Sequence, residues 1–195
     1  MELNRICVFA GANPGKNASY LKAAASLGSL LADREIGLVY GGGRVGLMGA
    51  VADAALKKGG EVIGVIPEFL CRKEVAHQGV QDMRVVNSMH ERKALMADLS
   101  DAFVALPGGF GTLEELLEIS TWTQLGVHAK PCGLLNVAGY YDGLLQQLTH
   151  AVEEQFIKPA HANLVQIAES AEDMLDRLKT YAPSDLAHWM DSAGT

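Results

Sequence analysis

The alternation of two kinds of segment constrains the fold of this chain more than any other feature of its sequence. Short apolar runs of strand length recur along the chain, and between them lie longer segments whose apolar residues repeat at helical spacing. Continuous apolar runs are typical of strands that are covered on both faces of a sheet. Their alternation with helices predicts an α/β fold, namely a Rossmann-like, doubly wound parallel sheet of about seven strands with helices on both faces.

The predicted strands are Arg5–Ala10, Ile36–Tyr40, Glu61–Ile66, Met83–Asn87, Ala102–Leu106, Cys132–Asn136 and a weaker seventh at Ala162–Ile167. The predicted helices are Ser19–Asp33, Leu47–Lys58, Met89–Leu99, Thr112–Leu125, Tyr141–Gln155 and Ala171–Tyr181. We expect them to form one nucleotide-binding catalytic domain, residues 1–181, which suits a chain of 195 residues with 49% hydrophobic content. In the remaining tail, 182–195, three apolar residues (Leu186, Trp189 and Met190) share one helical face, which favours a docked tail over a frayed one.

Charge and cysteine usage exclude several classes of function. The formal net charge of −7 disfavours DNA or RNA as a partner, because nucleic-acid phosphates require a basic surface. No run of about 18 apolar residues is present to span a membrane, and the first residues lack the pattern of a secretory signal, so we expect a cytoplasmic protein. The widely spaced cysteines (Cys7, Cys71 and Cys132) and the histidines lack the spacing of a disulfide framework or a metal site, and we expect Cys7 and Cys132 to be buried.

Three glycine-rich turns each follow a predicted strand: 11–15 (GANPG), 41–46 (GGGRVG) and 107–112 (PGGFGT). Glycines let backbone amides approach a phosphate, and the helix that follows points its positive end at the anion. Any single turn is explained equally well as a tight strand-to-helix connection. Three turns at one edge of a sheet predict a site for an anion or a nucleotide. None matches the P-loop spacing, and none reads GxGxxG with a later acidic residue, which disfavours ordinary NAD binding.

Charged residues near two helix starts are candidates for chemistry. Glu114 and Glu115 are predicted in the first turn of a helix, where the helix dipole would keep both carboxylates ionised. Such a carboxylate suits a positively charged sugar transition state, although acidic residues are also common there for structural reasons. Ser88 and Glu91 have the spacing of a capping box, in which each side chain bonds the other residue's amide. Arg92 falls on an apolar, inward helical face, so it needs an anionic partner or lines a cleft; a structural ion pair is the alternative.

The motifs GGGRVGLMG (41–49), MHERKA (89–94) and PGGFGTLEE (107–115) stand in an order and spacing that resemble the LONELY GUY family of cytokinin-activating phosphoribohydrolases, in its bacterial form. The likeness runs from about residue 5 to about residue 181. Members were formerly labelled lysine decarboxylases. Decarboxylation with pyridoxal phosphate requires a Schiff-base lysine and its supporting site, and the sequence identifies none.

The resemblance implies a hydrolase that cleaves the N-glycosidic bond of cytokinin riboside 5′-monophosphates, AMP or both, giving free base and ribose 5-phosphate without a cofactor or a metal. It implies Arg92 and Glu115 as the catalytic pair, in a homodimer whose site lies near the subunit junction. It implies a phosphate held by the backbone of Gly108, Gly109 and Gly111 and by the hydroxyl of Thr112. The other residues implied to bind substrate are Lys93, Phe110, Glu114, Thr121, Gly43, Gln78 and Asn13.

Two positions depart from the family pattern. Many plant members have a glutamate where Gln78 stands, so we expect that contact with substrate to be lost or altered. The family often has a serine where Asn13 stands, and since Asn can still hydrogen-bond we expect this contact to be retuned rather than lost. In the implied reaction Glu115 would stabilise a ribosyl cation and orient water. Arg92 would hold the phosphate or a ribose hydroxyl, or assist departure of the base. The alternative function is a non-catalytic nucleotide-binding or sensing module; a DNA-handling Rossmann relative is compatible with the fold but not with the charge.

Overall fold

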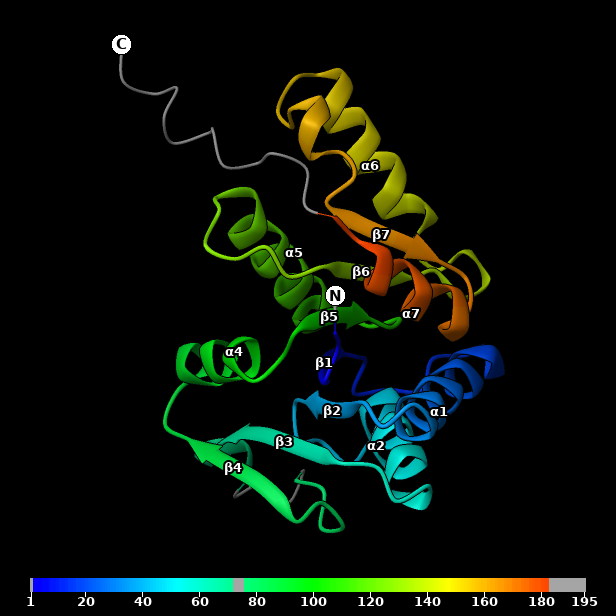
Figure 1. The fold of residues 1–195 in the computed structure, drawn as a ribbon, viewed down its shortest axis with the longest axis vertical. Coiled ribbons are helices and arrows are strands. Elements are labelled where there is room, and N and C mark those ends of the chain that lie inside the picture. Colours follow the sequence, from blue (N-terminus) through cyan, green and yellow to red (C-terminus); the bar gives the residue numbers. More distant parts are fainter. Residues whose placement is uncertain (1, 72–75, 183–195) are drawn as a thin grey trace.

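The computed structural model describes residues 2–71 and 76–182 and contains one seven-stranded sheet whose strand pairs are all parallel (Figure 1). Its strand order is β4-β3-β2-β1-β5-β6-β7. The strands are β1 (Arg5–Phe9), β2 (Gly37–Tyr40), β3 (Val62–Pro67), β4 (Asp82–Val86), β5 (Ala102–Ala105), β6 (Cys132–Leu135) and β7 (Val165–Ala168). The predicted doubly wound fold is therefore confirmed.

The helices alternate with the strands as predicted. They are α1 (Ala18–Asp33), α2 (Gly46–Lys57), α3 (Glu68–Cys71), α4 (Met89–Asp98), α5 (Phe110–Gln124), α6 (Asp142–Glu153) and α7 (Ala171–Thr180), with 3-10 turns at Val137–Gly139 and Pro159–His161. Only the one-turn α3 and the 3-10 turns were not predicted. Within the described ranges, no helix is both long and apolar enough to cross a membrane.

Helices cover both faces of the sheet (Figure 1), and one hydrophobic core lies beneath each layer of helices. Side chains alternate along β1, so that Ile6 and Val8 join the core beneath α1, α2 and α7, whereas Cys7 and Phe9 join the core beneath α4 and α5. Both Cys7 and Cys132 are buried, as expected. This double covering explains why the central strands read as continuous apolar runs.

The order of the strands reverses between β1 and β5, which are neighbours in the sheet. From β1 the chain winds outward to β4, and from β5 it winds outward to β7. A crevice opens at such a switch point, outside the carboxyl ends of the strands. A hydrogen bond from the amide of Gly11 to the carbonyl of Pro107, 3.1 Å long, joins the two turns that flank this point.

Several predicted details are wrong. The edge strands are not covered on both faces, since Val85 in β4 is 54% exposed and Ile167 in β7 is 41% exposed. The seventh strand begins at Val165 rather than at residue 162. The helix α5 begins at Phe110, two residues before the predicted start at Thr112. Of the predicted C-terminal tail, 183–195 lie outside the described residues.

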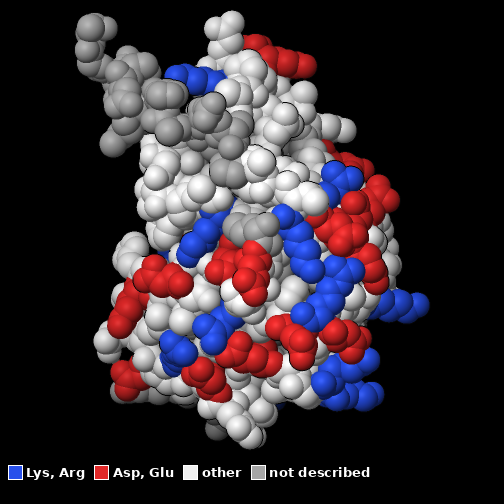
Figure 2. All heavy atoms as spheres, in the orientation of Figure 1, with Lys and Arg blue, Asp and Glu red and all other residues white. Residues whose placement is uncertain are grey.

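Charged side chains are distributed unevenly over the surface. On the face shown in Figure 2, acidic and basic groups intermingle and gather mainly over the lower half of the molecule. The upper part, built by α5, α6 and β7, shows few of them. No continuous basic stripe of the kind that nucleic acids require is visible on this face.

Candidate active site

A cleft of about 400 Å³ lies at the carboxyl ends of the central strands, where the three glycine-rich turns meet α4 and α5. This volume is in the range of sites for small molecules. Its described lining residues are Ala10, Gly11, Ala12, Asn13, Gly41, Gly43, Val45, Met48, Ile66, Leu70, Met89, Arg92, Gly109, Gly111, Thr112, Glu114 and Glu115. The predicted convergence of the three turns is therefore correct.

Arg92 and Glu115 form a buried ion pair in the wall of the cleft. Arg92 Nη1 donates to Glu115 Oε1 at 2.5 Å, and Arg92 Nε donates to the carbonyl oxygen of Val65 at 3.1 Å. Each side chain is 9% exposed. The sequence predicted that Arg92 turns inward and has an anionic partner or lines a cleft, and in the structure it does both. An ionic group that lines a cleft while it is held on two sides is suited to binding or chemistry.

The electrostatic environment of Glu115 differs from the predicted one. Because α5 begins at Phe110, neither Glu114 nor Glu115 lies in its first turn, so the helix dipole is not what sets their charge. Burial raises the pKa of Glu115 above its ordinary value, and the positive charge of Arg92 opposes this rise. The site therefore combines a desolvated carboxylate with a fixed cation.

Lys93 lies outside the cleft. Its ammonium group donates to Glu114 Oε1 at 2.5 Å and to Glu118 Oε1 at 3.0 Å, so it joins α4 to α5 beside the Arg92–Glu115 pair. Its side chain is 12% exposed. The structure thus pairs two residues, Lys93 and Glu114, that the family resemblance implies as separate substrate ligands.

The start of α5 leaves backbone donors open to the cleft. No side chain caps this helix, whose N-cap is Gly109, and its first backbone bond runs from Leu113 to Gly109. A Cβ placed at Gly109 or Gly111 would meet no heavy atom within 4 Å, so the described chain leaves space over both. Thr112 is buried in the cleft wall. Free amides at a helix start facing open space form an anion cradle.

The start of α2 serves a different purpose. The amides of Leu47 and Met48 both donate to the carbonyl oxygen of Gly11, at 2.9 and 3.3 Å. The positive end of α2 is therefore used to hold the first turn in place. The start of α4, whose first residue Met89 also lines the cleft, is capped by Ser88, so among α2, α4 and α5 it is α5 whose first amides remain available to a ligand.

Several predicted site residues do not line the cleft. Phe110 is 95% exposed, Gly108 lines a neighbouring cavity, and Gln78 is exposed in the described segment that begins at residue 76. That segment is anchored to the second turn by the amide of His77, which donates to the carbonyl oxygen of Gly42 at 2.9 Å. The predicted capping box is half correct: Ser88 Oγ accepts from the amide of Glu91, but the Glu91 carboxylate accepts from Asn87 instead of Ser88.

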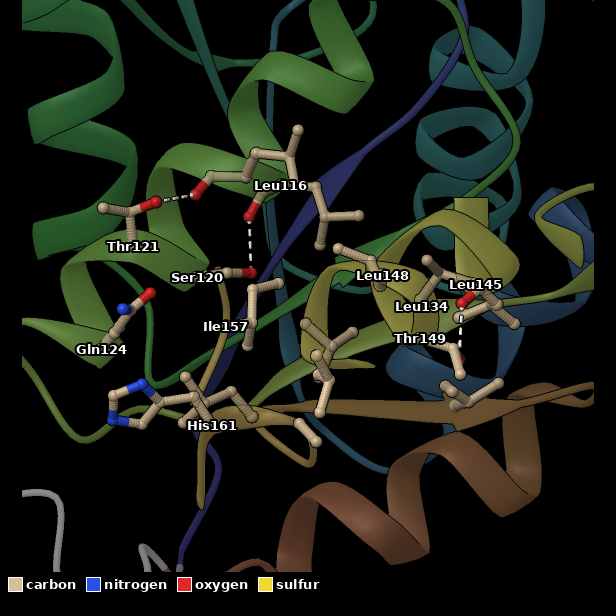
Figure 3. Close-up of a pocket in the computed structure, with 16 residues that line it drawn as sticks. Leu116, Ser120, Thr121, Gln124, Leu134, Leu145, Leu148, Thr149, Ile157 and His161 are labelled. Atoms are coloured by element: carbon tan, nitrogen blue, oxygen red, sulfur yellow. Dashed lines mark hydrogen bonds between the residues drawn. The ribbon is translucent and has the colours of Figure 1, made fainter. Parts of the chain in front are cut away.

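Thr121, another predicted site residue, lies in a different part of the molecule from the cleft. Its hydroxyl donates to the carbonyl oxygen of Leu117 at 2.7 Å, and it lines a separate apolar groove of about 250 Å³ between α5 and α6 (Figure 3). Figure 3 shows Leu116, Ser120 and Leu145 from the two helices directed into this groove. Within one chain, Thr121 therefore does not join the Arg92–Glu115 site.

Two groups of residues were missed from the sequence. The first is the apolar part of the cleft, with Val45, Met48, Ile66, Leu70 and Met89. The second is the connection after β6, which also ends at the carboxyl edge of the sheet and contains Gly139. This connection contains a single glycine, so its sequence does not stand out as the three glycine-rich turns do. No group of three or more His, Cys, Asp or Glu side chains that could hold a metal is found in the parts of the chain that the structure describes.

Comparisons with known proteins place this geometry in a family. Residues 48–178 match a family model described as possible lysine decarboxylase. The chain is 55% identical over 179 residues to a probable cytokinin riboside 5′-monophosphate phosphoribohydrolase of Oryza sativa subsp. japonica, covering 92% of this chain and 79% of that one. The chain belongs to the cytokinin riboside 5′-monophosphate phosphoribohydrolase family. A second member, from Arabidopsis thaliana, is 52% identical over 182 residues and covers 93% and 85% of the two chains.

Among solved structures, this chain is also similar in fold to proteins whose names are not those of hydrolases. A molybdenum cofactor binding protein from Rippkaea orientalis superposes with a TM-score of 0.70 at 28% identity, covering 92% of this chain and 98% of that one. A molybdenum cofactor carrier protein from Chlamydomonas reinhardtii gives a TM-score of 0.67 at 22% identity, covering 91% and 97%. The second likeness shows the shared fold alone. The same architecture therefore carries proteins with different ligands.

Proposed function

We propose that this protein hydrolyses the N-glycosidic bond of a nucleoside 5′-monophosphate and releases free base and ribose 5-phosphate. The observation that carries the proposal is the buried Arg92–Glu115 pair in the wall of a cleft that also receives the open amides at the start of α5. The pair provides a carboxylate for a sugar cation, and the amides provide an anion site. The names of the related hydrolases give the same reaction.

The reaction needs no covalent intermediate. As the bond from C1′ of the ribose to the base nitrogen breaks, its electron pair leaves with the base and the ribose gains oxocarbenium character. Glu115 stabilises this cation and orients a water molecule, whose oxygen bonds to C1′ while its proton is passed on to the departing base. Arg92 holds Glu115 in place and offers its remaining N–H groups to the phosphate or a ribose hydroxyl. Asn13, Thr112 and Glu114, which also line the cleft, complete the polar contacts.

The apolar part of the cleft supports an adenine base with an apolar substituent. Val45 and Met89 are 41% and 38% exposed, and both line the cleft together with Ile66 and Leu70. Burial of such surfaces by a prenyl group would contribute about 1–3 kcal/mol relative to plain adenine. We therefore propose cytokinin riboside 5′-monophosphates as preferred substrates and AMP as a poorer one.

The test is release of free base from AMP, isopentenyladenosine 5′-monophosphate and their unphosphorylated nucleosides. We expect base from both nucleotides, faster from the prenylated one, and little from the nucleosides. Folded protein that releases no base from either nucleotide would refute the hydrolase. The alternative, a non-catalytic binding module, is favoured by the likeness to the cofactor-binding protein of Rippkaea orientalis. Tight nucleotide binding without turnover would support that alternative.

Lysine decarboxylation has less support. A decarboxylase that uses pyridoxal phosphate requires a lysine in its site to form the Schiff base. No lysine in the described ranges lines the cleft, and Lys93, which lies nearest in sequence to Arg92, is engaged with Glu114 and Glu118. Consumption of lysine that depends on pyridoxal phosphate would overturn this part of the proposal.

The groove between α5 and α6 supports a homodimer. The helix α6 has no buried residue, although it directs Leu145, Leu148 and Val152 to the groove. None of the described lining residues is Asp, Glu, Lys or Arg, and the exposed Leu117 and Ile167 extend the apolar surface. Because the groove lining is neutral, two chains that each carry a net charge of −7 can meet through this face without bringing like charges into direct contact. In such a dimer Thr121 would lie at the subunit junction.

The oligomeric state tests this proposal directly. We expect a mass near twice 20.8 kDa by light scattering at micromolar concentration, and a monomer for Leu117→Glu, which places a charge in the groove. The matched control is Val85→Glu at the opposite sheet edge, which should remain dimeric. A monomeric wild type, or a dimeric Leu117→Glu, would refute the groove as the dimer interface.

A further inference from the structure

Two consecutive tyrosines lie behind the glycine-rich turn that opens α5. The hydroxyl of Tyr140 donates to the carbonyl oxygen of Gly108 at 2.5 Å, and the hydroxyl of Tyr141 donates to the carbonyl oxygen of Leu106 at 2.6 Å. The carbonyl between these two, that of Pro107, accepts from Gly11 as described above. Three successive carbonyls of the turn are therefore held by donors from other parts of the fold.

Because the peptide bond is planar, the direction of each of these carbonyls fixes the direction of the N–H group of the next residue. In a trans peptide, the carbonyl of one residue and the N–H of the next point in opposite directions, and the described chain has no cis peptide bond. A carbonyl of Gly108 that is directed to Tyr140 therefore turns the N–H of Gly109 away from Tyr140. Tyr140 and Gly108 line a smaller cavity of about 190 Å³, whereas Gly109 lines both this cavity and the cleft. The Gly109 amide therefore lies on the side of this peptide opposite Tyr140, and Gly109 itself borders the cleft.

The tyrosines are themselves held firmly. Ala138 adopts a left-handed conformation, with φ 52° and ψ 36°, and Gly139 follows with φ 70°, so two left-handed residues turn the chain back toward the sheet. The side chain of Asn136 then accepts a hydrogen bond from the amide of Tyr141 at 2.7 Å. A non-glycine residue in this conformation is costly and is retained only where its surroundings require it.

Aromatic contacts fix the ring of Tyr140. It meets the ring of Tyr141 edge-on at 4.8 Å between centroids and the ring of Tyr20 at 5.5 Å. Tyr141 is 2% exposed, and burial raises the pKa of its hydroxyl, which stays a proton donor over the physiological range. Tyr140 is 43% exposed, so its hydroxyl can be removed without opening a cavity in the core.

We propose that Tyr140 is a positioning residue for the phosphate of the substrate, acting through the Gly108–Gly109 peptide, with Tyr141 and Gly11 holding the two preceding carbonyls. The proposal rests on the proposed function, because it takes the anion at the start of α5 to be the 5′-phosphate. Tyr140 touches the turn from behind and does not contact the reacting atoms. Removal of its hydroxyl frees the Gly109 amide to turn away, so phosphate affinity falls while the Arg92–Glu115 pair is untouched.

The experiment compares wild type, Tyr140→Phe and the control Tyr20→Phe, which alters a tyrosine of the same cavity. For Tyr140→Phe we expect KM for AMP to rise about tenfold, the size of one lost hydrogen bond to an anion, with kcat changed less than about twofold. The dissociation constant of ribose 5-phosphate, measured by calorimetry, should rise by the same factor. Tyr20→Phe should leave both constants unchanged.

The outcomes separate this proposal from the function on which it rests. A wild type that releases no base refutes the hydrolase, but the affinities for ribose 5-phosphate still decide the role of Tyr140. Unchanged ribose 5-phosphate affinity in Tyr140→Phe would overturn the positioning role. A fall in kcat of Tyr140→Phe with unchanged KM would indicate a merely structural effect and would also overturn the positioning role. The same holds if Tyr20→Phe weakens ribose 5-phosphate binding as much as Tyr140→Phe does. Failure of ribose 5-phosphate to bind the wild type would do the same.

Discussion

Arg92 and Glu115, which come from different helices, meet at 2.5 Å in a wall of the cleft where each side chain is 9% exposed. A buried ion pair is weak evidence for stability, because the cost of removing two charges from water offsets most of their attraction. Its position beside the open start of α5 is the stronger clue. The fold keeps a carboxylate desolvated but near a cation, which prepares it for a positive charge that develops on the substrate.

The first prediction concerns the charge of Glu115. Glu115→Gln keeps the size of the side chain and an oxygen that can accept from Arg92, but it removes the negative charge. We expect kcat/KM for the nucleotide to fall by about 10²–10³-fold, the range for loss of one preorganised electrostatic group. Base release measured by chromatography checks the rate, and circular dichroism checks the fold.

The matched control is Glu118→Gln, the same change one helical turn further along α5. Glu118 pairs with Lys93 and is not among the described residues that line the cleft. Its substitution should change kcat/KM by less than about threefold, because it acts at most through the long-range field. A folded Glu115→Gln that retains more than about a tenth of the wild-type rate would remove Glu115 from the catalytic pair.

The second prediction is the pH dependence of the reaction. Burial raises the pKa of Glu115 above the ordinary value of 4.5, and activity requires the ionised form. The acid limb of kcat/KM should therefore lie above that ordinary value, and Glu115→Gln should lack it. An acid limb at or below the ordinary value would contradict the assignment.

The same pKa makes a prediction for stability with a definite sign. A carboxyl group whose pKa is raised in the folded state binds its proton more tightly when folded. Its contribution to stability is complete below the unfolded pKa and is lost as the pH rises through the folded pKa. The free energy of unfolding of the wild type, relative to Glu115→Gln, should therefore fall as the pH rises from the ordinary carboxyl value of 4.5 through the raised pKa of folded Glu115. Urea denaturation of both proteins across this range measures the difference.

Much of this fold was predictable because its signals are local. Each central strand is covered on both faces and so reads as an apolar run, and each of the three glycine-rich turns contains a glycine that positive φ or close packing requires, namely Gly15, Gly42 and Gly108. The inward orientation of Arg92 followed from helical spacing alone. The first residue of α5 could not be predicted in this way, because Phe110 and Gly111 are poor indicators of a helix start and no capping side chain marks it.

The interactions between distant segments could not be predicted in this way. The contact between Tyr140 and Gly108 joins residues 32 positions apart, and its formation depends on the left-handed conformation of Ala138, which the sequence does not mark. Likewise, helical spacing placed Lys93 beside Arg92 but could not show whether it faces the cleft or Glu114 and Glu118. Such choices depend on how α4 and α5 pack together, which is a property of the whole fold.

The third prediction separates Lys93 from the substrate. The positive charge of Lys93 helps to lower the pKa of Glu115, against the larger effect of burial. Lys93→Gln should therefore move the acid limb of kcat/KM to higher pH, while KM for AMP at neutral pH changes less than about twofold. Loss of the bridge between α4 and α5 should lower stability by about 1 kcal/mol, since one partner, Glu114, is half exposed. A tenfold rise in KM without movement of the acid limb would instead place Lys93 against the substrate.

The fourth prediction uses the close approach of the second glycine turn to the catalytic pair. A Cβ at Gly41 would lie 2.1 Å from Arg92 Nη2 and 3.3 Å from the sulfur of Met48. The guanidinium must then shift, and it cannot do so freely because Val65 and Glu115 hold it on two sides. A misplacement of about 1 Å in such a site costs roughly 10²-fold in rate.

Gly41→Ala should therefore lose about two orders of magnitude in kcat/KM and keep its fold, because Gly41 is not among the described glycines with positive φ. The matched control is Gly143→Ala in α6, where the added Cβ meets no heavy atom within 4 Å. That variant should keep full activity and gain up to about 1 kcal/mol of stability from helix propensity. Measurement of kcat/KM and of the thermal unfolding midpoint for both variants tests these expectations. A Gly41→Ala enzyme within a few-fold of the wild-type rate would show that the position of Arg92 does not limit the reaction.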